Sequence, residues 1–284
     1  MARCSSTCVC STTSRHSSLS WIVSVSWLGD TLDRLVPARV ERRLARALGA
    51  WTDGEFGLAL DIWAPLARAG HPRAQSNMGA AFLEGKGVER DHAKAATWLK
   101  AAAEGGDSGG QRNWALCLYE GWGTEQDHAQ SAVWYERAAE QGDIDAADMI
   151  SWMKLVGGGC PQDYPGARRW AERAASEGRT GAMARLGDIH HNALGTARDP
   201  AEAARWWGEA ARRGHAEAQT MLGAAYLAGK GVARDPVEAL HWLLRAQAGG
   251  AGELAVGFLK EARAHARPSQ RAEAERRAAL ELAS

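Results

Sequence analysis

The side chains best suited to chemistry in this 284-residue sequence are an aspartate and three histidines between positions 188 and 215. They offer the oxygen and nitrogen donors that bind divalent metals, which suggests metal-assisted hydrolysis. No nucleophile motif, phosphate-binding loop or pair of carboxylates accompanies them. A metal-dependent hydrolase using Asp188 and His191 is therefore the less favoured alternative, and we expect no catalytic residue, metal or cofactor. The group consists of Asp188, His190, His191 and His215.

A second possible metal site is the cysteine-rich start of the chain. Cys4, Cys8 and Cys10 precede His16, but no second pair of ligands follows at a spacing known for zinc sites. Residues 1–29 are rich in serine, threonine and cysteine and show no hydrophobic periodicity. We therefore interpret them as a disordered tail rather than a metal site.

The elements that would have to position any site in this chain are repeated. Five residues recur unchanged four more times at intervals of 36 residues. A fixed period without insertions means that each unit has one shape and stacks on its neighbour, which is typical of a solenoid. This signal concerns architecture and binding rather than catalysis. In the first unit the five residues are Gly87, Asp91, Trp98, Ala102 and Gly106.

Four of the recurring residues mark the start, one face and the end of a single predicted helix. Asp91 is predicted to be its N-cap, because its carboxylate can accept hydrogen bonds from the free amides of the first turn. Trp98 and Ala102 lie four residues apart on one face, so we expect the tryptophan to be buried and the alanine to mark a close helix crossing. Gly106 is expected just past the helix end in a left-handed conformation.

A second helix precedes this one in each unit. Ala74, Met78, Gly79 and Phe82 are spaced to form one apolar face with a notch at the glycine. A short glycine-containing loop then forces the two helices to run antiparallel. The sequence therefore predicts an all-α solenoid of antiparallel helix pairs with a 36-residue repeat.

The whole pattern resembles the Sel-like (Sel-one) repeat family, relatives of the tetratricopeptide repeats. The units that end at Gly106 and Gly250 fit nearly in full, whereas the third unit has Ser151 at the notch and Lys154 at the aromatic position. The resemblance covers about two thirds of the chain. It implies a right-handed α/α superhelix that binds proteins or peptides and carries no catalytic residues.

Cysteine usage bears on the compartment. Some secreted members of the family staple each helix pair with a disulfide, but here Cys117 and Cys160 do not recur with the period, and the total of five cysteines is odd. A cytoplasmic location is the simpler interpretation. The apolar stretch Trp21–Leu28 leaves a secreted or periplasmic, envelope-associated interaction module as the alternative, although Asp30 and Asp33 stand where a secretion signal would be uncharged.

The charge balance bears on the partner. Lys plus Arg and Asp plus Glu both number 34, so no global field attracts nucleic acid or an anionic membrane. No apolar run of about 18 residues is present, so no transmembrane helix is expected. We therefore expect a protein or peptide partner and no nucleic acid, with the chain acting as an adaptor in bacterial signalling, regulation or complex assembly.

The chain is predicted to have four parts. In the second part, Leu48 is expected on the buried face of a first helix, and Pro65 is expected to kink or end the helix that follows. The parts are a tail at 1–29, N-terminal capping helices or a degenerate repeat at 30–70, five repeats at 71–250, and C-terminal capping helices at 251–284.

In a tetratricopeptide-like superhelix the first helix of each unit lines a concave groove, so its outward-facing positions are the candidate binding residues. Asn77 and Asn113 are equivalent, and an Asn ladder can hydrogen-bond the backbone of an extended peptide. Trp152 lies off the core column and is a candidate anchor; Glu217 and Met221 are further candidates. The alternative interpretation for each candidate residue is an ordinary solvated or partly packed side chain without a binding role. The predicted groove is Arg73, Asn77, Glu84, Arg112, Asn113, Tyr119, Asp145, Asp148, Trp152, Arg185, Asp188 and His191.

Overall fold

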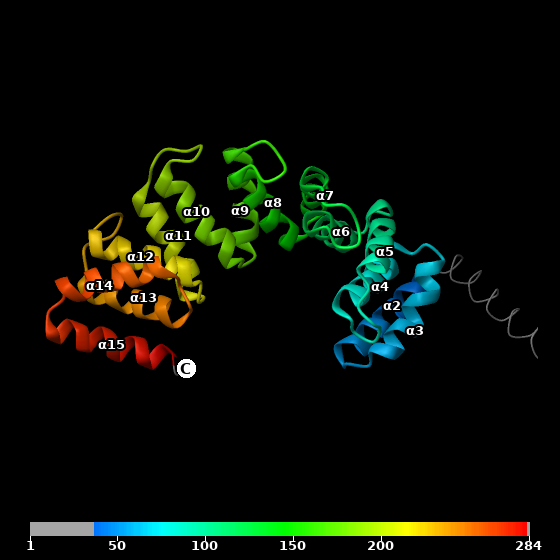
Figure 1. Ribbon diagram of the computed structural model, residues 1–284, viewed down its shortest axis with the longest axis horizontal. Helices are drawn as coiled ribbons and strands as arrows, with labels where there is room; N and C mark the ends of the chain where they lie inside the picture. Colours follow the sequence, from blue (N-terminus) through cyan, green and yellow to red (C-terminus); the bar gives the residue numbers. More distant parts are fainter. Residues whose placement is uncertain (1–36, 283–284) are drawn as a thin grey trace, which may run out of the picture.

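The computed structural model describes residues 37–282, which form α-helices joined by short loops, with no strand in that range (Figure 1). The expectations for the tail, the Cys4–His16 group and Trp21–Leu28 lie outside the described residues. The helices are α2 (Pro37–Thr52), α3 (Phe56–Arg68), α4 (Pro72–Glu84), α5 (His92–Glu104), α6 (Ser108–Glu120), α7 (His128–Glu140), α8 (Ile144–Val156), α9 (Tyr164–Ser176), α10 (Thr180–Asn192), α11 (Pro200–Arg212), α12 (Ala216–Ala228), α13 (Pro236–Ala248), α14 (Glu253–His265) and α15 (Pro268–Leu282).

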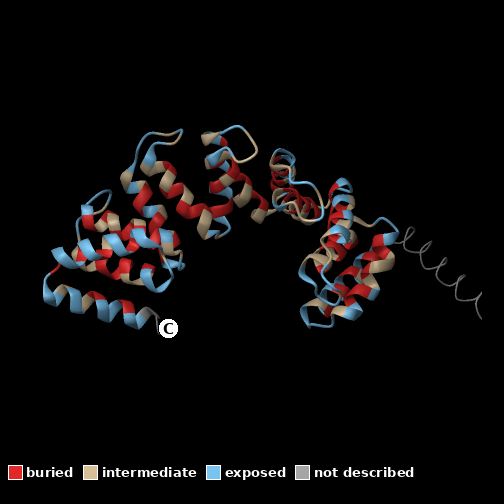
Figure 2. Ribbon diagram, in the orientation of Figure 1, coloured by how far each residue is buried: buried red, intermediate tan, exposed pale blue. Residues whose placement is uncertain are grey.

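Each 36-residue unit is a helix pair. The most extensive contacts in the chain join α4 to α5, α6 to α7, α8 to α9, α10 to α11 and α12 to α13. Each second helix also packs against the first helix of the next pair, and the buried residues form four hydrophobic clusters that follow one another along the chain. In Figure 2 the buried residues follow the facing sides of the helices, and the loops are exposed or of intermediate burial. The prediction of an all-α solenoid of helix pairs is confirmed.

The recurring aspartate caps the second helix of every pair, as predicted. The Asp91 carboxylate accepts from the Lys94 amide at 3.0 Å, and Asp235 accepts from the Val237 amide at 2.8 Å. The other three aspartates of the column bond in the same way. Each bond satisfies an amide that the helix itself leaves free, so the cap sets where the second helix begins.

The tryptophan column is less buried than the sequence predicts. Trp170 and Trp242 are buried, but Trp98, Trp134 and Trp206 are only half-buried. The fully enclosed column is the next residue along the chain, and in the three repeats that have glycine at the notch that side chain packs into it. A Cβ at Gly79 would lie 2.5 Å from Leu99 Cγ. The five members of this column are Leu99, Tyr135, Ala171, Trp207 and Leu243.

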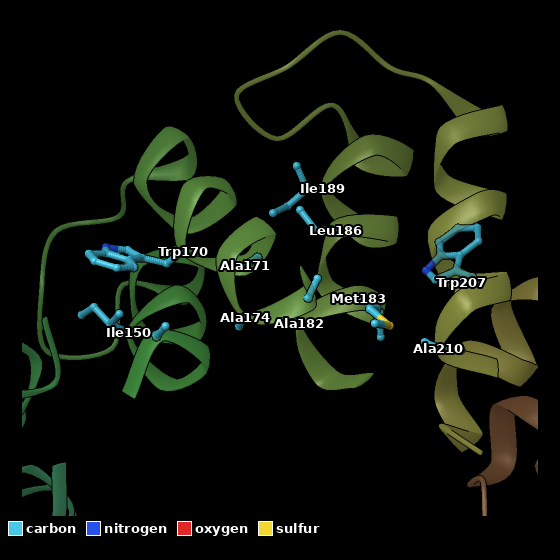
Figure 3. Packing of buried hydrophobic residues seen from close by; sticks show 14 of the residues in the cluster. Ile150, Trp170, Ala171, Ala174, Ala182, Met183, Leu186, Ile189, Trp207 and Ala210 are labelled. Carbon is cyan, nitrogen blue, oxygen red and sulfur yellow. The ribbon is translucent and has the colours of Figure 1, made fainter. Parts of the chain in front are cut away.

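Alanine lets successive pairs approach closely. Figure 3 shows Ala171 and Ala174 of α9 facing Ala182 and Leu186 of α10, and all four are fully buried. An alanine at such a crossing lets two backbones meet without a void, since a larger side chain would force them apart. The predicted close crossing at the alanine column is confirmed.

The loop glycines join one pair to the pair before it. Gly123 has φ +69°, and a Cβ there would collide with the carbonyl oxygen of His92, the first residue of α5. At Gly231 the same collision would involve the carbonyl of Pro200, which begins α11. Glycine is therefore required at these positions both for the left-handed backbone and for the contact between repeats.

The N-terminal helices differ from expectation at two residues. Leu48 is 56% exposed, and Ala47 faces the interior in its place. Pro65 neither ends nor visibly interrupts α3, because the helix continues to Arg68 and the Ala69 amide still bonds the Pro65 carbonyl at 3.0 Å. Proline inside a helix removes one amide bond and crowds the carbonyl four residues earlier, yet α3 continues for three residues beyond it.

The C-terminal helices do not form a further pair. Only residues 266–267 separate α14 from α15, and α15 packs against α13 instead of returning along α14. It buries Ala274 and Ala278, and its Arg277 pairs with Glu238 at 3.0 Å. No large apolar residue among residues 268–280 is buried, which explains why the sequence reads as a mostly solvated cap.

The stacked pairs form an open arch (Figure 1). α4 contacts α6, α8 contacts α10, and α12 contacts α14, whereas no two second helices make comparable contact within the described range. The first helices therefore lie on the inner side of the curve and the second helices on the outer side. No helix of residues 37–282 is long and apolar enough to cross a membrane.

Candidate functional site

We define the concave face as the inner side of the arch, formed by α4, α6, α8, α10, α12 and α14. Each predicted groove residue belongs to one of the first four of these helices. These four helices begin 36 residues apart and have the same length of 13 residues, so equivalent positions line up from one repeat to the next. Asn77, Asn113, Arg185 and Met221 are equivalent in this sense, and all four are half-buried.

Charged residues of this face form ion pairs between repeats. Arg112 of α6 pairs with Asp143, the cap of α8, at 2.8 Å and with Asp145 of α8 at 3.4 Å. Asp145 also pairs with Arg179, the cap position of α10, at 2.5 Å. Three successive repeats are thereby linked along the face. Exposed pairs contribute little stability one by one, but a chain of them holds neighbouring helices in one orientation.

A second set of contacts joins α8, α10 and α11. Arg185 donates to Asp148 at 2.8 Å. Asp188, one turn further along α10, accepts a hydrogen bond from the indole Nε1 of Trp207 at 3.1 Å. Burial raises the pKa of Asp188, although the indole hydrogen bond and the charge of Arg185 act in the opposite direction. Burial also lowers the pKa of Arg185, against the effect of both carboxylates.

The predicted aromatic residues lie together rather than apart. The ring of Tyr119 stacks on His128 with centroids 4.6 Å apart and meets Trp152 edge-on at 6.1 Å. Trp152 is half-buried and packs against the central core. It is thus partly a packing residue, which limits the surface that it can offer to a partner.

The remaining predicted residues have more local partners. Arg73 pairs with Glu41 of α2 at 3.1 Å, and Glu84 pairs with Lys86 at 2.6 Å. The Oδ1 atom of Asn113 accepts from its neighbour Arg112 at 3.4 Å. Asn77, half-buried on α4, has no side-chain bond within residues 37–282 that would occupy its amide.

The residues considered for metal-assisted hydrolysis do not converge. Within residues 37–282 no three His, Cys, Asp or Glu side chains lie close enough to hold a metal ion. His191 instead packs against Trp207, with ring centroids 5.2 Å apart. His215 caps α12, where its Nδ1 accepts from the Ala218 amide at 3.3 Å. These two histidines have structural partners, whereas the buried Nδ1 of His190 has no hydrogen-bond partner within residues 37–282. Nothing in the arrangement points to a hydrolase.

An apolar pocket opens at the α14 end of the concave face, and we call it the end pocket. It has a volume of about 180 Å³. Sequence reasoning placed His191 and Met221 on this face, but it missed Trp207 and Phe258. A signal for Trp207 exists, because it is a second tryptophan directly after Trp206, at the column that enters the notch. The lining is His191, Trp207, Met221, Ala224, Ala225, Ala228, Lys230 and Phe258.

The mouth of the end pocket carries positive charge. Lys230 is one of its lining residues, and the Nε of Arg198 donates to the carbonyl oxygen of His191 at 3.1 Å. Burial lowers the pKa of His191, and the charges of Arg198 and Lys230 lower it further. The imidazole is therefore neutral near pH 7, and the cationic character of the mouth comes from the other two side chains.

A larger hollow lies on the outer side, between α5 and α7. Its volume is about 720 Å³, and its lining includes Thr97, Lys100, Gln130 and Trp134. An equivalent hollow of about 500 Å³ between α11 and α13 is lined by Trp242. Trp134, the half-buried member of the tryptophan column in this part of the chain, borders the first hollow, which explains why its ring is not fully enclosed. We call the first of them the outer hollow.

The ranges in which the chain matches a known family coincide with the helix pairs described above. The model of the Sel1 repeat family matches residues 72–107, 108–143, 144–178, 180–215 and 216–250. No curated protein matches the chain.

Two solved structures resemble the chain over most of its length. A protective antigen of uropathogenic Escherichia coli strains, which displays an SLR fold, is 27% identical over 85% of this chain, with a TM-score of 0.71. This chain covers 54% of that antigen. A Sel1 repeat protein from Oxalobacter formigenes is 25% identical, over 80% of this chain and 99% of the other, with a TM-score of 0.70. With five matched repeats that fill more than half of its length, the chain belongs to the Sel1 repeat family.

Proposed function

We propose that this protein is a non-enzymatic scaffold that binds an extended segment of a partner protein along its concave face. Sel1 repeat proteins are generally protein-interaction scaffolds. The observation that carries the proposal for this chain is the end pocket, an apolar recess bounded by three successive first helices and one indole. A recess of this kind on a curved repeat surface is suited to anchoring one side chain of a bound segment.

The ion pairs along the face support the same function in another way. Arg112, Asp145 and Arg179 hold three repeats in fixed relation, so the face is arranged before a partner arrives. A rigid surface loses little conformational entropy on binding, and more of the contact energy then appears as affinity. Asn77, near the other end of the face, offers an amide that can bond the backbone of an extended segment.

The proposal is tested by disrupting one face at a time. Partners are first identified by crosslinking and mass spectrometry in native cells. The concave variant carries Asn77→Arg and Met221→Arg, which place bulky charges at equivalent positions near both ends of the face. The matched control carries Thr97→Arg and Gln130→Arg, which place the same charges in the outer hollow. Circular dichroism and thermal melting establish that both variants are folded.

We expect the concave variant to lose the crosslinked partners and the outer variant to keep them. Loss with the outer variant alone would move the binding surface to the second helices. Retention by both variants would contradict binding at either surface.

A further inference from the structure

The end pocket is sized for one side chain. Its volume is about 180 Å³, and an apolar cavity of about 150 Å³ is enough to hold a benzene-sized molecule. The walls are the rings of His191, Trp207 and Phe258 and the thioether of Met221, with three alanines between them. One aromatic or large aliphatic side chain fits this space.

The pocket walls contain few hydrogen-bonding groups that a polar ligand would have to satisfy. The one polar atom of the Trp207 indole is already bonded to Asp188 at 3.1 Å. Met221 is flexible and polarizable, so it can adjust to apolar groups of different shape. Apart from the nitrogens of His191 and Lys230, the lining offers no free side-chain hydrogen-bonding group. A polar side chain that enters the pocket would therefore lose more hydrogen bonds to water than it regains, which is unfavourable.

The charge around the pocket constrains what lies beside that side chain. Lys230 is part of the lining, and Arg198, although not a lining residue, bonds the backbone carbonyl of the lining residue His191. No carboxylate belongs to the lining. Rim charges of one sign select partners more than they add affinity, because a like charge is rejected there and an opposite charge is accepted.

We propose that the end pocket takes a large apolar side chain of the partner and that Lys230 and Arg198 select an Asp or Glu side chain next to it. This inference rests on the proposed function and specifies the ligand at one end of the concave face. The partner is thus a protein segment in which an acidic residue adjoins an aromatic or large aliphatic one.

The end pocket includes a residue from outside the five matched repeats, so it also sets the register of a bound segment. Phe258 of α14 stands at the position that Leu222 occupies in α12, and Leu259 stands where α12 has Gly223. Leu259 is buried, whereas Phe258 is half-buried and lines the pocket. A single anchor at one end means that a segment binds in one position only.

The test is selection of random linear peptides displayed on phage against the full chain and four variants. Ala224→Trp fills the pocket, and Ala80→Trp adds the same side chain at the equivalent, half-buried position of α4 as a matched control. Phe258→Ala removes a wall instead, which keeps the test decisive if the filled variant does not fold. The fourth variant, Lys230→Glu with Arg198→Glu, reverses the charge of the mouth. Circular dichroism reports the fold of each.

We expect the wild-type chain to enrich peptides with a large apolar residue beside Asp or Glu. Ala224→Trp and Phe258→Ala should weaken binding of these peptides by about tenfold to a hundredfold, the loss expected for one buried apolar side chain. Ala80→Trp, at the far end of the concave face, should weaken the binding of these peptides less than Ala224→Trp does. The charge-reversed chain should enrich Lys or Arg beside the same apolar residue.

Unchanged binding by folded Ala224→Trp and Phe258→Ala would overturn the pocket while leaving a concave binding face possible. Selection of apolar residues with no acidic preference would overturn the role of Lys230 and Arg198. Failure of the wild-type chain to enrich any peptide would count against the proposed function itself as well as this inference.

Discussion

The indole Nε1 of Trp207 donates a hydrogen bond to the Oδ1 of Asp188 at 3.1 Å. Trp207 is only 3% exposed and fills the notch at Gly187, where a Cβ would collide with the indole. Its hydrogen bond reaches a carboxylate on the concave face. The same residue therefore completes the core of the fourth repeat and forms a wall of the end pocket.

The ionised carboxylate of Asp188 should lower the stability of the folded protein at neutral pH. Burial raises its pKa, and an acid with a raised folded-state pKa contributes stability below its unfolded pKa that is lost as pH rises through the folded value. Asp188→Asn keeps an acceptor for the indole and never ionises. We expect this variant to be at least as stable as the wild-type chain near pH 7, with the difference shrinking toward about pH 3. Urea titrations across this range measure it. A variant that is clearly less stable near pH 7 would mean that the charge of Arg185 outweighs burial.

Two adjacent tryptophans should differ strongly in their contribution to stability. Trp207→Ala would empty the notch of the fourth repeat and should cost about 3–5 kcal/mol. Trp206 is half-buried and lies under the guanidinium of Arg205, whose Cζ is 4.3 Å from the ring centroid. Its change to alanine should cost less than half as much, since much of the ring is already in contact with water. Denaturant titrations of the two alanine variants measure both losses of stability. Equal losses would mean that both rings belong to the core.

Glycine should be required more strictly in the loops than at the ends of the second helices. Gly106 has φ +88° with open space around it, so Gly106→Ala should cost about 1 kcal/mol of backbone strain. Gly123→Ala adds a collision with the His92 carbonyl and should cost about 3 kcal/mol or more. Thermal melting of the two variants measures the difference. Similar costs would show that α5 can move away from the loop without penalty.

The thiol of Cys117 should be unreactive in the folded protein. It is fully buried, and burial raises its pKa to about 11. The thiolate needed for alkylation is therefore scarce near pH 8. Cys160 is half-buried, and burial raises its pKa too, against the charge of Lys154. With iodoacetamide and peptide-resolved mass spectrometry, we expect Cys160 to react slowly and Cys117 only after unfolding. Rapid labelling of Cys117 in the native chain would reveal local opening of α6.

Some of the candidate site was predictable from spacing alone. The equivalence of Asn77 and Met221 follows from the period, and so does their place on the first helix of a pair. The period also placed Arg112 and Asp145 on one face. It did not reveal that these two residues pair with each other, because that depends on how far one repeat turns relative to the next.

The tryptophan column shows that a repeating pattern does not by itself identify the buried residue. A recurring large residue is expected in the core, yet the fully buried position is the next one, held by Leu99, Trp207 and their equivalents. The column of identical residues was easier to see than a column that varies from alanine to tryptophan. Burial follows from which side chain meets the notch, and the sequence does not mark that directly.

The sequence by itself determined the unit: where each helix begins, which residues cap it, where glycine must turn the chain, and that identical pairs stack. These features depend on local rules of hydrogen bonding and backbone sterics, which act within a few residues. Only the tertiary structure decided that Phe258 and Trp207 meet around the end pocket and that α15 packs on α13. Those outcomes arise where the repeat is incomplete, so contacts between distant residues, rather than the period, set the geometry.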